Sequence, residues 1–399
     1  MNRIGRAVNL LVNRIGRPVN LLGMADRRSP VRAALAFAVG AAALGGCAAD
    51  RPDPPPYPAT SEQAAWRPSW NSAAGKGAPG FRPAVVGDAV WVAAADGNVR
   101  RLSKRTGRSE LDVKLPARLG AGVGADEAIV VVVSRDGDVI ALDRDGQQRW
   151  STPLQGEVVT APVVASSVIV VRTIDGRIVA LDRDGGSVRW TWQRTLPTLT
   201  LRQSTPPVIR GDTVYAGMAG ARVVAIDLRF GAPRWETVIA TPRGTTELER
   251  LVDIVGAPAL AADQICAIAY QGKLACLRTD DGRIAWSRDL ASSSGLSLHG
   301  ETVITVDASD VVQAVRPAGD PLWKQDGYVR RGLTAPAVDG ERVLFGDRFG
   351  NLTALSLADG TPLARLTLDG TPFASAPAIV DGVAYAQTVG GTVAAIAIP

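Results

Sequence analysis

The sequence contains only one histidine and three cysteines in 399 residues. Zinc sites need several such ligands close together, so this composition argues against zinc chemistry. Aromatic residues make up only 5% of the chain, whereas 42 glycines and 26 prolines indicate a backbone that turns often. Together with 46% hydrophobic residues, this composition excludes general disorder and favours one large all-β domain.

The chain has little net charge outside its first 46 residues. Overall, 44 lysines and arginines stand against 39 aspartates and glutamates. Residues 1–46 hold seven arginines and one acid, Asp26, which leaves 37 basic and 38 acidic residues in the remainder. A nucleic-acid partner recognised through a basic surface is therefore excluded.

Residues 1–46 have the pattern of a bacterial export signal. Three arginines precede an apolar run of 12 residues, 33–44, which is too short to cross a bilayer. Two glycines and Cys47 follow, an ending that resembles the lipobox of bacterial lipoproteins, in which the cysteine is diacylated and becomes the new amino terminus. We therefore predict lipidation of Cys47; the alternative is a plain secreted protein. By resemblance to enterobacterial sorting, Ala48 favours the outer membrane.

The start and the end of this amino-terminal region carry two further signals. Residues 2–11 recur almost unchanged at 13–22, ahead of a complete signal that begins at Met24. We favour Met24 as the true start over a functional extension. Residues 47–60 are polar and rich in proline, and we predict an extended tether between the lipid and a folded body at 61–399.

From about residue 80 the sequence repeats a motif in which short apolar runs are separated by turns. The clearest copies, at 136–150 and 175–190, read DGDVIALDRDGQQRW and DGRIVALDRDGGSVRW. Each copy contains three or four short runs typical of β-strands, and a period near 40 residues is that of propeller blades. Eight copies occur, with their first-turn glycine position at Gly97, Gly137, Gly176, Ala221, Gly272, Asp310, Gly350 and Gly391.

These repeats predict an eight-bladed β-propeller of four-stranded antiparallel blades. A single blade cannot cover both of its faces, whereas stacking in a ring buries them. The last copy ends at Pro399 without an outer strand, and residues 63–72, with Trp66 or Trp70, are predicted to supply it and close the ring. Five tryptophans recur at one place in the repeat and are predicted to dock adjacent blades rather than to bind a ligand: Trp150, Trp190, Trp235, Trp286 and Trp323.

The repeats resemble those of pyrroloquinoline-quinone-dependent dehydrogenases, and with the lipobox the closer resemblance is to the BamB family of lipoproteins of the outer-membrane β-barrel assembly machinery. Two intervals between copies are long, at 45 and 51 residues. They contain loops that resemble those with which BamB proteins contact the periplasmic POTRA domains of BamA. In the first loop, 195–208, the family's Leu-x-Leu-Arg core is matched by Leu199, Leu201 and Arg202.

The second loop, residues 241–260, resembles an acidic, arginine-containing stretch of the same family. Glu249, Arg250 and Asp253 match, but Val255 replaces a second aspartate, which predicts a smaller electrostatic share in the interface. The alternatives are that the two leucines of the first loop are ordinary core residues, and that Arg250 and Asp253 form a solvated helical ion pair.

The resemblance implies a non-catalytic scaffold lipoprotein on the periplasmic face of the outer membrane. It implies binding to BamA, assistance in the folding and insertion of outer-membrane β-barrel proteins, unfolded forms of those proteins as further partners, and no cofactor. The alternatives are a quinone-dependent enzyme that uses the propeller channel and an envelope scaffold with another partner.

Two observations bear on these alternatives. The chain has no adjacent cysteine pair, and its single histidine, His299, has no nucleophile or second base beside it in the sequence, both of which disfavour an enzyme. Cys266 and Cys276 flank one hairpin turn, where either a cross-strand disulfide or two buried thiols are expected.

Overall fold

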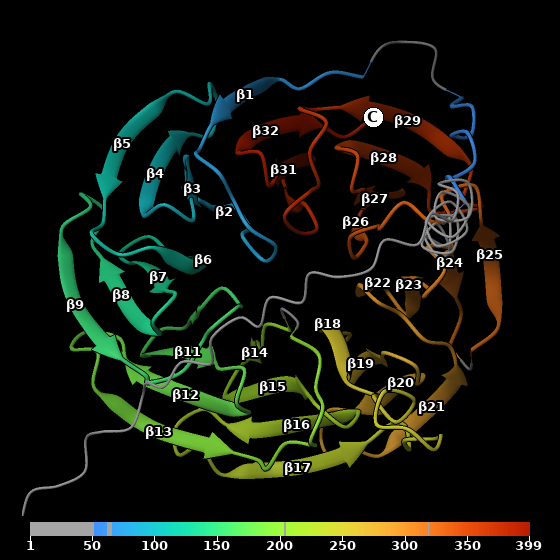
Figure 1. Ribbon diagram of the computed structural model, residues 1–399, viewed down its shortest axis with the longest axis horizontal. Coiled ribbons are helices and arrows are strands. Elements are labelled where there is room, and N and C mark those ends of the chain that lie inside the picture. Colours follow the sequence, from blue (N-terminus) through green and yellow to red (C-terminus); the bar gives the residue numbers. More distant parts are fainter. Residues whose placement is uncertain (1–51, 62–65, 203–204, 318) are drawn as a thin grey trace, which may run out of the picture. The chain divides into compact units, whose positions relative to one another are not determined.

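Every regular element among the described residues of the computed structural model is a β-strand (Figure 1). The structure describes residues 52–61, 66–202, 205–317 and 319–399. The predicted export signal and Cys47 lie outside the described residues. In this part of the chain, no helix is long and apolar enough to span a bilayer.

The described strands form eight four-stranded antiparallel sheets, which we number as blades 1 to 8. Blades 1 to 4 comprise β2 (Ala84–Val86), β3 (Ala89–Ala93), β4 (Asn98–Ser103), β5 (Ser109–Lys114); β6 (Leu119–Ala125), β7 (Val130–Ser134), β8 (Asp138–Leu142), β9 (Gln148–Pro153); β10 (Val163–Val164), β11 (Val168–Arg172), β12 (Arg177–Asp182), β13 (Val188–Gln193); and β14 (Val208–Arg210), β15 (Thr213–Met218), β16 (Arg222–Asp227), β17 (Pro233–Val238). Blades 5 to 8 comprise β18 (Ile254–Leu260), β19 (Gln264–Ala269), β20 (Lys273–Arg278), β21 (Ile284–Asp289); β22 (Gly295–His299), β23 (Thr302–Val306), β24 (Val312–Val315), β25 (Pro321–Gln325); β26 (Ala337–Asp339), β27 (Arg342–Gly346), β28 (Asn351–Ser356), β29 (Pro362–Thr367); and β30 (Ala378–Val380), β31 (Val383–Gln387), β32 (Thr392–Ala397) with β1 (Trp70–Ala73).

The blades bury their apolar strands against one another. All five residues of β7 are buried, because neighbouring blades cover both faces of the middle strands. One hydrophobic cluster joins Val131 and Val139 of blade 2 to Ile169 and Val179 of blade 3, and equivalent clusters join the other neighbouring pairs. The predicted eight-bladed propeller is confirmed, and burial between blades holds it together.

Four of the five recurring tryptophans dock adjacent blades through the indole N–H, as predicted, and Trp286 packs against the apolar cluster between blades 5 and 6. The indole N–H of Trp150 on β9 donates to the backbone oxygen of Arg183 in blade 3, at 3.0 Å. The ring also covers Gly186, where an added Cβ would lie 2.6 Å from a ring carbon, so only glycine fits. The same hydrogen bond to the next blade is made by Trp190, Trp235 and Trp323.

The amino-terminal strand closes the ring, also as predicted. Strand β1 pairs antiparallel with β32, and the indole N–H of Trp70 donates to the backbone oxygen of Lys104 in blade 1, at 2.9 Å. Trp70 therefore takes the docking role. Trp66 does not, because its indole N–H donates to Ala397 within its own blade, at 2.7 Å.

The question of Cys266 and Cys276 is settled by their register. They lie directly opposite each other on β19 and β20, both are buried, and a disulfide joins them.

The predicted tether, residues 47–60, differs from a free spacer in its described part. From Asp53 onward the chain belongs to the same compact unit as the propeller. Arginine side chains of blade 7 and of the connection before it hold this segment by hydrogen bonds to its backbone oxygens, for example from Arg330 to Asp53 at 2.9 Å. The composition alone gave no sign of these partners, which lie more than 270 residues away.

Candidate functional site

The two long loops lie on one face of the ring. Residues 194–207 connect β13 of blade 3 to β14 of blade 4, and residues 239–253 connect β17 of blade 4 to β18 of blade 5 (Figure 1). Because the four strands of a blade alternate in direction, these connections share a face with the turns between second and third strands. We call this the loop face.

Asp253 ties the two loops together. Its carboxylate accepts hydrogen bonds from the backbone N–H of Leu201 at 2.6 Å and of Gly220 at 2.9 Å. The first bond reaches the first loop, and the second reaches a turn of blade 4. Asp253 is only 5% exposed. Its position differs from the surface contact expected from the sequence, because both carboxylate oxygens are used inside the chain.

The leucines of the first loop point to different environments. Leu199 is 41% exposed, whereas Leu201 is half-buried and lines a small cavity with Arg172 and Ile174. Neither residue lies in a strand. Of these two leucines, only Leu199 presents its side chain to solvent, whereas Leu201 packs at the base of the first loop.

Arg202 is paired rather than free. Its guanidinium donates two hydrogen bonds to the carboxylate of Glu157, from the connection before blade 3, and the Nε–Oε2 distance is 3.2 Å. These bonds hold the pKa of Glu157 below its usual range. Both side chains are partly exposed, and such pairs contribute little to stability.

In the second loop, Glu249 caps a turn. Its carboxylate accepts the backbone N–H groups of Thr245 at 2.8 Å and Thr246 at 3.0 Å. These bonds lower the pKa of Glu249 to about 2. Arg250 pairs with Glu247 at 2.9 Å, so the alternative of a helical ion pair between Arg250 and Asp253 is wrong.

One exposed residue of this face was missed by the sequence reasoning. Leu248, between Glu247 and Glu249, is 63% exposed. A leucine surrounded by charged residues in an insertion between blades has no core to enter, and this local pattern is the signal that could have found it. Leu199 and Leu248 give each long loop one exposed apolar side chain.

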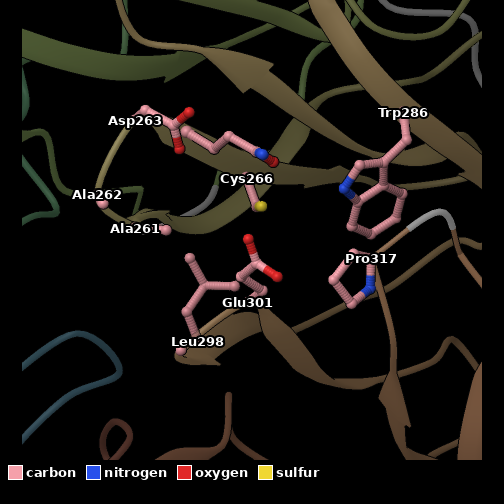
Figure 2. Close-up of a pocket in the computed structure, with 10 residues that line it drawn as sticks. Ala261, Ala262, Asp263, Cys266, Trp286, Leu298, Glu301 and Pro317 are labelled. Atoms are coloured by element: carbon pink, nitrogen blue, oxygen red, sulfur yellow. The ribbon is translucent and has the colours of Figure 1, made fainter.

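A cavity of about 180 Å³ lies elsewhere, between blades 5 and 6 (Figure 2). Figure 2 shows the ring of Trp286 beside Pro317, with Glu301 reaching toward Cys266 of the disulfide. The cavity is lined by turns between first and second strands, which lie on the face opposite the loops. Within the described ranges, no group of three or more His, Cys, Asp or Glu side chains is placed to hold a metal ion.

A family model described as outer membrane protein assembly factor BamB matches residues 95–318 and 308–398. The protein of that name from Bordetella pertussis is 36% identical over 361 residues, which cover 88% of this chain and 94% of that protein. The chain belongs to the BamB family. The protein of that name from Escherichia coli is 31% identical over 357 residues, or 86% of this chain and 91% of that protein.

A solved structure of a BamB protein agrees with this membership. The crystal structure of BamB from Moraxella catarrhalis matches with a TM-score of 0.74 and 27% identity, covering 80% of this chain and 96% of that one. The quinohemoprotein alcohol dehydrogenase from Comamonas testosteroni matches with a TM-score of 0.63 but only 16% identity, over 82% of this chain and 76% of that one. The second likeness shows the shared propeller fold alone.

Proposed function

We propose that this BamB-family chain is a non-catalytic scaffold of the outer-membrane β-barrel assembly machinery. Its predicted export signal and lipidated Cys47 anchor it to the periplasmic face of the outer membrane, and its loop face binds the POTRA domains of BamA. The observation that carries this proposal is the joining of the two long loops through buried Asp253, within a chain of this family.

The proposed interface has an apolar and a charged part. Leu199 and Leu248 supply exposed apolar anchors, one on each loop. Arg202 supplies a forked donor that exchanges Glu157 for a carboxylate of the partner. Asp253 and Glu249 do not meet the partner in this proposal; they fix the loop backbones so that binding costs little ordering entropy.

The assisted step is the folding and insertion of outer-membrane β-barrel proteins. A rigid propeller bound to the POTRA array orients that array, and its strand edges also suit unfolded client chains by β-augmentation. The likeness to a quinohemoprotein dehydrogenase supports no enzyme here, because it concerns a fold that hosts both binding proteins and enzymes.

Affinity capture through a carboxy-terminal tag tests the partner surface. We expect Leu199→Glu to lower the recovery of BamA at least tenfold, because it places a charge at the proposed apolar contact. Val188→Glu is the matched control, since Val188 on β13 is 50% exposed but lies outside the loops. Equal recovery with both variants, at equal thermal stability, would refute the surface. Recovery of a different envelope complex without BamA would favour the scaffold with another partner.

A further inference from the structure

The proline-rich segment after the predicted lipidation site is attached to blades 6 and 7 through Tyr57. The guanidinium carbons of Arg331 and Arg365 lie 3.2 and 4.2 Å from the centroid of the Tyr57 ring. Two cations over one aromatic ring make a strong cation–π contact, the more so because Arg331 is only 4% exposed. We call the contact of Tyr57 with its partners the Tyr57 clasp.

The hydroxyl of Tyr57 adds two hydrogen bonds to the clasp. It donates to a carboxylate oxygen of Asp347 at 2.5 Å and accepts a hydrogen bond from the side-chain amide of Asn351 at 2.6 Å. Asp347 and Asn351 are both buried. Burial, with the bond to Asp347 next in importance, raises the pKa of Tyr57 to about 12, so the hydroxyl stays protonated and able to donate.

Arg331 depends on this segment. Among the described residues it forms no ion pair, although it is a buried cation. Its compensation is the face of the Tyr57 ring and the backbone oxygen of Pro55, to which it donates. Because a buried charge without a partner is costly, the arginine and the segment form one unit.

The sequence of the segment lowers the entropic cost of docking. Five of the seven residues from Pro52 to Pro58 are prolines, which favour an extended, stiff backbone before binding. Pro58 packs directly on Gly327, where an added Cβ would lie 2.4 Å from a proline ring carbon. The segment therefore packs closely against the connection between blades 6 and 7.

The clasp limits the reach of the lipid anchor. Asp53 lies six positions after Cys47, and a fully extended chain of six steps spans at most about 22 Å. If the contacts of residues 53–58 with blade 7 and the connection before it were all lost, the backbone hydrogen bond of Ser61 to Pro362 would still hold the chain, and the fourteen residues from Cys47 to Ser61 span up to about 50 Å. Docking thus shortens the tether by more than half.

The rim beside the clasp suits a lipid surface. Phe349 lies in the turn after β27, close to Asp347, and is 39% exposed. The guanidinium carbons of Arg348 and Arg331 lie 4.9 and 5.9 Å from its ring centroid. Arg348 is exposed like Phe349, whereas Arg331 is buried beneath the Tyr57 ring, so this turn offers one aromatic ring and one accessible arginine to phospholipid headgroups.

We infer that the Tyr57 clasp fixes the orientation of the propeller on the membrane. The turn of Arg348 and Phe349 lies on the loop face, between the second and third strands of blade 7. This edge of the ring lies against the lipid headgroups, and the ring is tilted so that the long loops of blades 3 to 5, across the same face, are held away from the bilayer, where a periplasmic partner reaches them. This inference rests on the proposed lipid anchor at Cys47.

Energy transfer from a fluorophore to acceptor lipids tests the orientation. The lipidated full chain is bound to vesicles of phosphatidylethanolamine and phosphatidylglycerol, with a label at Ser309→Cys or at Asp136→Cys. These exposed residues occupy equivalent turns on the loop face of blades 6 and 2, which lie opposite each other in the ring of eight. We expect at least twofold greater transfer from position 309.

Variants of the clasp separate orientation from anchoring. Tyr57→Ala removes the difference between the two labels, whereas Pro56→Ala, at an exposed proline, retains it. Arg365→Ala gives a second disruption if Tyr57→Ala fails to fold. Phe349→Ser lowers the transfer from position 309, and Phe230→Ser, at an exposed phenylalanine on the opposite face, does not.

Vesicle flotation tests the anchor separately: the fraction of protein that floats with the vesicles is compared between the unmodified chain and Cys47→Ser. If neither chain is lipid-bound, the anchor fails and the orientation with it. If the unmodified chain floats but transfer is equal from both labels, or is unchanged by Tyr57→Ala and Arg365→Ala, the clasp does not orient the propeller.

Discussion

Replacement of Asp253 by alanine should weaken both the fold and the partner surface, although its side chain is buried. The carboxylate accepts two backbone hydrogen bonds, at 2.6 and 2.9 Å. Hydrogen bonds to a charged group contribute about 1.5–3 kcal/mol each, and water replaces part of what is lost. We therefore expect a loss of roughly 3 kcal/mol in the free energy of unfolding, and a fall in Tm of roughly 5 °C for a domain of this size.

The assay combines thermal unfolding with capture of BamA well below the melting temperature. Asp253→Ala should reduce capture because the loop that carries Leu199 loses its connection to the second loop. Asp253→Asn keeps one acceptor oxygen but turns its amide N–H group toward the other backbone donor, so it should lose about as much stability as Asp253→Ala. An unchanged Tm together with unchanged capture in Asp253→Ala would refute the reasoning.

Three further predictions concern other parts of the molecule. Gly186→Ala should cost about 3 kcal/mol in chemical denaturation because its Cβ meets a tryptophan ring at 2.6 Å, whereas Gly211→Ala, also at positive φ but in open space, should cost only about 1; equal costs would contradict the docking role. The lowered pKa of Glu249 means that its capping is complete above pH 4.5 and is lost as the pH falls through about 2, so amide protection of the second loop should persist at pH 4 in exchange measurements. Loss of protection already at pH 4 would exclude the cap. Replacing Cys266 and Cys276 together by alanine should lower stability by about 3 kcal/mol, from the closure entropy of a short loop, without altering BamA capture; unchanged denaturation would show that the disulfide contributes nothing.

The ring could be predicted from the sequence because its signals are local and repeated. Each copy carries its own turn residues and five of the eight copies carry a tryptophan at the same place, so the blade count and the docking of Trp150 follow from spacing alone. Closure followed from the missing outer strand after the last copy, and β1 supplies it.

The details of the site depend on approaches between distant residues. The burial of Asp253 results from the approach of Leu201 and Gly220, which no spacing in the sequence reveals. The prolines around Tyr57 are typical of a free tether, and only the fold brings Arg331 beneath its ring. A resemblance between loops predicts which segments meet a partner, but not which side chains face outward.

The most direct test of the central claim is photo-crosslinking in cells from a reactive amino acid placed at each exposed leucine of the loop face. From Leu199 and Leu248, we predict an adduct with BamA. From the equally accessible Val188 on β13, we predict none. Adducts of equal yield from all three positions, or none with BamA from the two leucines, would contradict a partner surface built by the two loops.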